Sequence, residues 1–118
     1  MKTRYREIPP YVTKDGTVIR ELMHPAVHGN RNQSLAEAVL EPGAASHPHR
    51  HAVAEEIYHF TRGAGRMSLA GVEFDVQAGD TVLIEPGQVH WVRNTGSEPM
   101  VILCCCSPAY AHEDTELI

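Results

Sequence analysis

Four of the eight histidines of this 118-residue chain lie in one short stretch, SHPHRHAVAEEIYH, at residues 46–59. Two adjacent carboxylates, Glu55 and Glu56, belong to the same stretch. Imidazoles and carboxylates are often only solvated, but they also build proton relays and sites for Fe, Mn, Ni, Cu and Zn. The stretch alone leaves three interpretations open: a polar surface patch, a proton relay, or part of a metal site.

Spacing within the stretch is compatible with a metal site and equally with solvated histidines. Side chains at positions i and i+2 of an extended segment point to the same side, so His49 and His51 project together. The chain then turns through AVAE, and Glu56 begins the next strand. Glu56 shares its parity with Tyr58, which predicts both side chains on the pocket side and Glu55 on the outside. Two adjacent segments would thus supply three ligands of the kind that transition metals prefer.

A second histidine motif lies downstream, in GDTVLIEPGQVHWVRN at residues 79–94, and the two stretches together resemble the paired motifs of the cupin superfamily. The first family motif runs Gly, five residues, His-x-His, three or four residues, Glu, six residues, Gly. The matching residues here are Gly43, His49, His51, Glu56 and Gly63. The second motif runs Gly, five residues, Pro-x-Gly, two residues, His, three residues, Asn. The corresponding residues are Gly79, Glu85, Gly87, His90 and Asn94, and Glu85 replaces the family's proline, a turn residue that is not a ligand.

The resemblance implies a small β-barrel whose two sheets enclose one metal ion. Carried over residue by residue, its ligands would be His49, His51, Glu56 and His90. The expected cofactor is one divalent transition-metal ion per chain, with Fe, Mn, Ni and Zn all compatible with these ligands. Three neutral imidazoles and one carboxylate would leave the ion with a net charge near +1. An octahedral ion would keep two positions open for water, substrate or dioxygen.

Short β-prone runs must position these residues. Gly, Pro, Asn and Asp separate the runs, and no long stretch has a helical period. The runs lie at 17–23, 34–40, 55–61, 66–70, 72–76, 81–85, 89–94 and 100–106, with a tight hairpin expected at Gly71. This pattern predicts an all-β antiparallel sandwich or barrel. With the resemblance, we expect one cupin domain over 1–118, a jelly roll or double-stranded β-helix, with its motifs at about 43–63 and 79–94. The polar tail at 107–118 would cover an opening or fray.

Composition limits the partners. The formal net charge is −5 and the ten Lys and Arg residues are scattered, which argues against nucleic acid or an anionic membrane. No secretory signal or bilayer-spanning apolar run is visible, so we expect a cytoplasmic protein. The run Cys104–Cys106 is interpreted as small apolar fillers of a strand rather than as a soft-metal site. Apolar strand faces and an outward Trp91 favour a homodimer.

Two functional hypotheses follow. The first is a metalloenzyme, a dioxygenase, isomerase or lyase, that acts on a small oxygenated molecule. The second is a non-catalytic protein that binds or senses a small ligand through its metal. His47 and Tyr58 are the candidate catalytic acid–base groups, with a surface histidine and a barrel-wall tyrosine as the alternatives. His59 has the opposite parity to Glu56 and is expected outside the site, whereas the roles of Glu37 and His112 stay open.

Overall fold

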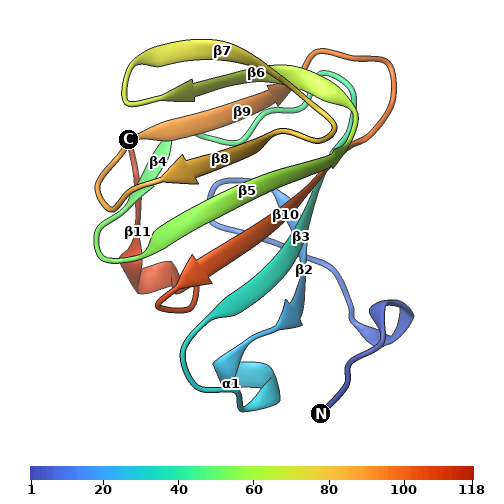
Figure 1. Ribbon diagram of the computed structural model, residues 1–118, viewed down its shortest axis with the longest axis vertical. Helices are drawn as coiled ribbons and strands as arrows, with labels where there is room; N and C mark the ends of the chain where they lie inside the picture. The colour runs from blue at the N-terminus through green and yellow to red at the C-terminus, as the bar shows by residue number, and fades with distance from the viewer.

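A computed structural model describes residues 1–118 and contains two antiparallel sheets that face each other as a jelly roll (Figure 1). The six-stranded sheet consists, in spatial order, of β1 (Tyr11–Val12), β2 (Val18–Met23), β3 (Ser34–Leu40), β10 (Met100–Ser107), β5 (Glu55–Arg62) and β8 (Thr81–Ile84). The five-stranded sheet consists of β11 (Thr115–Leu117), β4 (His49–His51), β9 (His90–Asn94), β6 (Ala64–Leu69) and β7 (Val72–Gln77). The predicted all-β antiparallel architecture is confirmed.

Three short helical segments accompany the sheets: η1 (Tyr5–Glu7), α1 (Pro25–His28) and η2 (His112–Asp114). The stretch HPAVHG, which reads as a turn, forms α1 because Pro25 suits the first helical position and the His24 ring accepts a hydrogen bond from the Ala26 amide at 3.0 Å. None of the helices has the length and apolar character needed to span a bilayer.

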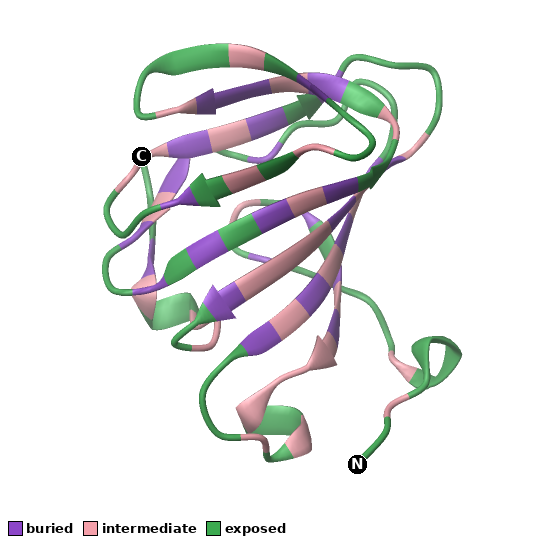
Figure 2. Cartoon of the chain, viewed as in Figure 1, coloured by how far each residue is buried: buried purple, intermediate pink, exposed green.

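Alternating burial along the strands defines the interior (Figure 2). On β5, Glu56, Tyr58 and Phe60 are buried between more exposed neighbours, and Glu55 is exposed, as the parity predicts. Strand β3 shows the same period of two. Because the two sheets face each other, these inward stripes form one shared interior.

Large apolar side chains fill one end of this interior, which we call the packed end. Its fully buried members are Phe60, Met67 and Met100, each 0% exposed. Two residues of the histidine motifs shape the adjoining loops. Asn94 is buried and its side-chain amide donates to the carbonyl oxygens of Leu40 and Glu98, at 2.8 Å each. Gly63 has φ +86°, and a Cβ there would lie 2.9 Å from the Met100 Cα, so only glycine fits.

Strand pairings at two places test specific expectations. The β6–β7 hairpin turns through Ala70 and Gly71, both with positive φ, which confirms the tight turn. The polar tail does not fray: it forms η2 and then β11, which pairs with β4 through Thr115↔His51 and Leu117↔His49. The tail is therefore built into the sheet that carries all three motif histidines.

Candidate metal centre

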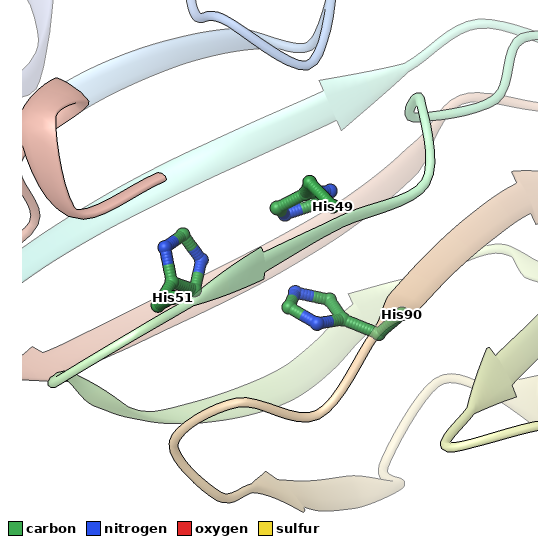
Figure 3. Close-up of side chains that lie close together, drawn as sticks. All are labelled: His49, His51 and His90. Carbon is green, nitrogen blue, oxygen red and sulfur yellow. The ribbon is translucent and has the colours of Figure 1, made fainter. Parts of the chain in front are cut away.

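Three imidazoles gather in the interior at the end opposite the packed end. His49 and His51 come from β4 and His90 from the neighbouring β9, where it pairs directly with His49 (Figure 3). One ring nitrogen of each lies within 4.8 Å of the corresponding nitrogens of the other two. All three side chains are buried. We call this region the polar end.

Backbone carbonyls fix the protonation pattern of two of the rings. The His49 Nδ1 lies 2.7 Å from the His47 carbonyl oxygen, and the His90 Nδ1 lies 2.9 Å from the Gln88 carbonyl oxygen. A carbonyl oxygen can only accept a hydrogen bond, so each Nδ1 carries a proton. In the neutral ring the Nε2 then offers its lone pair.

A threonine has the same effect on the third ring. The His51 Nδ1 lies 3.1 Å from the Thr115 Oγ1, and the Thr115 hydroxyl donates its single proton to the Ala111 carbonyl oxygen at 3.0 Å. Toward His51 the hydroxyl oxygen is therefore an acceptor, and the His51 Nδ1 donates. All three neutral imidazoles would thus present Nε2 lone pairs, which is how outer hydrogen bonds orient metal-binding histidines.

Glu56 brings a carboxylate to the same nitrogens. Its Oε1 lies 3.2 Å from the His51 Nε2 and 3.6 Å from the His90 Nε2, while its Oε2 accepts a hydrogen bond from the Cys106 thiol at 3.1 Å. Both Glu56 Oε1 and His90 Nε2 are buried without a hydrogen-bond partner. Adjacent ligands of an octahedral ion bound at about 2.1 Å are about 3.0 Å apart. A cation between these two acceptors would satisfy both, so the residues fit a metal ion.

Electrostatics favours the metal-binding forms of two of these groups. Burial would raise the pKa of Glu56, but the close approach and charge of the His51 and His90 imidazoles outweigh it and lower the pKa to about 2. Burial, together with the neighbouring His90, lowers the pKa of His49. For His51 the effect of burial is outweighed by the adjacent Glu56 carboxylate, which raises the His51 pKa. Protons therefore compete with a metal chiefly at His51.

Asp15 also reaches this site, although the sequence analysis did not single it out. It lies on the turn between β1 and β2, and its Oδ2 is 3.3 Å from the His49 Nε2. Its Oδ1 accepts hydrogen bonds from the Thr13 hydroxyl at 2.6 Å and the Thr17 amide at 2.9 Å. The local sequence VTKDGT carries the signal of a tight turn only, so no pattern distinguishes this aspartate from an ordinary turn residue.

A cavity of about 50 Å³ adjoins the histidines, and none of the nineteen residues that line it is Lys or Arg. Tyr58 is part of this lining, with its ring centroid 5.9 Å from that of His90. Burial raises the pKa of the Tyr58 phenol well above its usual range, and the Glu56 charge adds to the effect. Tyr58 is therefore a hydrogen-bond donor inside the cavity and not a base at neutral pH.

The cysteine run is reduced and partly inside the cavity. All three cysteines are free, and Cys104 and Cys106 line the cavity. Burial and the Glu56 charge raise the pKa of both thiols. They act as small fillers, as expected, and Cys106 additionally holds Glu56 through its S–H.

The remaining histidines that the sequence raised lie elsewhere. His47 is exposed and outside the cavity lining, and only its backbone contacts the site. His59 is half-buried and its Nδ1 lies 2.8 Å from the Thr81 hydroxyl oxygen, away from the cluster. His112 lies 3.0 Å from the Tyr110 hydroxyl.

Glu37, whose direction the sequence left open, has no part in the cavity. It is half-buried and accepts a hydrogen bond from the Tyr5 hydroxyl at 2.6 Å. Its neighbour across β2 is Arg20, whose guanidinium also bonds the Tyr5 hydroxyl. These contacts place Glu37 on the outer face of the six-stranded sheet.

Comparisons with known proteins identify the relatives of this chain. A family model for the cupin domain matches residues 36–106. An uncharacterized protein of Methanocaldococcus jannaschii is 47% identical over 118 residues, which is all of this chain and 94% of that protein. An oxalate-binding protein of Thermotoga maritima is 30% identical over 84 residues, 71% of this chain and 65% of that protein. The crystal structure of a predicted oxalate decarboxylase from Thermotoga maritima superposes with a TM-score of 0.79 at 25% identity, over 92% of this chain and 99% of that one.

Proposed function

This chain belongs to the cupin family, and on that premise we propose that it is a metalloenzyme that transforms a small oxygenated molecule. The proposed ligands of one divalent Fe, Mn, Ni or Zn ion per chain are His49, His51, Glu56 and His90. Such an ion supplies Lewis-acid or redox chemistry to a substrate at its open positions. One observation carries the proposal: two buried acceptors, Glu56 Oε1 and His90 Nε2, face each other at 3.6 Å with no hydrogen-bond partner.

The surrounding residues support a working site. Cys106 and the Nδ1 acceptors hold the four proposed ligands in one orientation. Tyr58 keeps its proton and lines the cavity, which suits a group that donates a hydrogen bond or a proton to a substrate oxygen. The exposed position of His47 leaves it as the weaker of the two catalytic candidates.

Metal content tests the proposal directly. The purified protein, reconstituted anaerobically with Fe(II), Mn(II), Ni(II) or Zn(II), should hold close to one ion per chain by elemental analysis. His51→Ala and His90→Ala should abolish this binding. His59→Ala, which removes a half-buried imidazole on the outer face, is the matched control and should leave the stoichiometry unchanged. A wild-type protein that holds none of the four metals would refute the metal centre.

A non-catalytic binding role is the second candidate, and the Thermotoga maritima relative named as an oxalate-binding protein favours it. Screening the metal-loaded protein for O₂ consumption and product formation with small enols, diols and thiols separates the two. Turnover that Tyr58→Phe slows would support the enzyme. Ligand retention without any product would support the binding protein.

A further inference from the structure

The cavity extends from the proposed ligands across a floor of small side chains. Strand pairing places Ala36 of β3 and Cys104 of β10 side by side, with Tyr58 of β5 next to Cys104. Two pairs further along the strands, Ser34 lies beside Cys106, and Cys106 lies beside Glu56. The small side chains of Ser34 and Cys106 also line the cavity. The two middle strands thus leave room where larger residues would fill the interior.

Glu21 stands at the other side of this floor. It pairs with Ala36 from β2, which makes it the fourth member of the row that ends at Tyr58. Three strand spacings separate β2 from β5, roughly 14 Å between backbones. Glu21 lines the cavity and is only 7% exposed. It therefore faces the proposed metal ligands from across the cavity.

One oxygen of Glu21 has no partner. Its Oε1 accepts a hydrogen bond from the Tyr11 hydroxyl at 2.7 Å, but its Oε2 is buried without any hydrogen bond. A buried carboxylate oxygen in this state is costly unless a donor reaches it. None of the cavity-lining residues is a lysine or an arginine that could serve. A molecule bound in the cavity can supply the missing donor.

The charge of the cavity further restricts the chemical class of the bound molecule. Three carboxylates, those of Asp15, Glu21 and Glu56, line it without a lysine or arginine, so with neutral imidazoles one divalent ion leaves the site net negative. A second anionic group on a ligand would face Glu21 and be repelled. A hydroxyl or ammonium group would instead donate to the free oxygen.

A second hollow shares Glu21 with the cavity. Glu21 and Tyr110 line both this cavity and a second, more open hollow beside α1 and η2. The hollow also contains His24 and His112, and its acidic members are Glu21 and Glu113. A molecule that enters from this side meets Glu21 before it reaches the histidines.

Resting on the proposed metal centre, we propose that Glu21 is the specificity-determining residue of this cavity. The ligand carries an oxygen group for the metal at one end and a hydroxyl or ammonium group for Glu21 Oε2 at the other. Linear dicarboxylates are disfavoured. The site thus differs in ligand class from the oxalate specificity that the name of its Thermotoga maritima relative states.

Matched probes test this assignment. The protein loaded with redox-inert Zn(II) is titrated by calorimetry with 4-aminobutanoate against succinate, and with 5-aminopentanoate against glutarate. Within each pair one end is the same carboxylate and the other end changes from ammonium to carboxylate. We expect the amino acid to bind at least tenfold more tightly in one or both pairs. Glu21→Gln should reduce that preference at least tenfold, whereas Glu55→Gln, on the outer face of β5, should leave it unchanged.

The outcomes separate this inference from the metal centre. Zinc content is measured on each sample, and a wild-type protein without zinc refutes the proposed function. Full zinc content with equal affinity for both members of every pair, including no binding of either, overturns the role of Glu21 alone. The wild-type preference needs no variant, so a Glu21→Gln protein that fails to fold does not remove the test.

Discussion

The packed end and the polar end of the interior are built on the same strands but differ in the size and polarity of their buried side chains. β5 contributes Phe60 to the packed end and Glu56 to the polar end, four residues apart. β10 changes from Met100 to Cys104 over the same distance, and Ile102 between them borders the cavity. At one end large apolar groups leave no space, and at the other small groups leave a cavity with unpartnered polar atoms. Burying such atoms costs free energy, so the packed end has to supply the stability that the polar end uses.

Removing a side chain from the packed end should give the largest effect. Phe60→Ala deletes a ring that is fully buried, which should lower the free energy of unfolding by about 3–5 kcal/mol. Denaturant unfolding of the metal-free protein measures this. Leu83→Ala, on a β8 residue that is 49% exposed, is the control and should cost about 0.5 kcal/mol. Equal losses would contradict the division into two ends.

Removing the metal from the polar end should lower the stability of the native state. An ion present at 100 to 1,000 times its dissociation constant stabilises the native state by about 3–4 kcal/mol. Chelation should therefore lower the melting temperature of the wild-type protein. The His51→Ala variant should melt at the same temperature with and without chelator. A wild-type melting temperature that chelation leaves unchanged would argue against a tight site.

Outer hydrogen bonds at the polar end should have a smaller effect. Thr115→Val removes the acceptor of the His51 Nδ1 while keeping the side-chain volume, and should weaken metal binding by about 10- to 100-fold. Thr81→Val is a matched control, because Thr81 makes the same contact with His59 on the outer face. Metal titration monitors both variants. Equal weakening in the two would show that Thr115 acts only through general stability.

Metal affinity should also depend on pH. The pKa of His51 is raised above the ordinary 6.5, so the metal-free site keeps a proton there that binding must displace. Affinity should rise by up to about tenfold per pH unit while His51 is protonated, and level off only above pH 6.5. The stability of the metal-free protein depends on pH in the opposite direction. Protonation of His51 stabilises the native state below the pKa that His51 has in the unfolded chain. This contribution is lost as the pH rises through the raised pKa of His51 in the folded protein. Dissociation constants measured from pH 5.5 to 8.5 test the first part, and a flat profile would contradict it.

Local spacing predicted most of the strands and the common direction of His49 and His51, whereas the approach of His90 to them was expected from the resemblance to the cupin motifs. The parity of Glu56 and Tyr58 also predicted their burial, because a period of two fixes which face a side chain takes. Asp15 escaped prediction because a turn aspartate looks the same whether or not it meets a distant histidine. Glu21 had a usable signal, the parity it shares with the buried Ile19, but nothing in the sequence says that its oxygen lacks a partner.

Long-range pairing was the other limit. Thr115 and β11 reach His51 from 64 positions away, and the polar residues around them give no periodic pattern. The ligand class was out of reach for a related reason, because it depends on which small side chains of β3 and β10 lie next to each other. Register across a sheet, unlike parity along a strand, is set by the whole fold.

The pairing of β11 with β4 has a consequence for the timing of metal loading. On the ribosome, His49 and His51 emerge well before Thr115, so the strand that completes their sheet edge and fixes the His51 ring arrives after both histidines. Until then the imidazoles that meet at the centre lack their final constraint. A nascent chain would therefore bind metal weakly, and the ion would enter a protein whose β11 has already left the exit tunnel. The cell's metal pool after synthesis, rather than during it, would decide which ion the site receives.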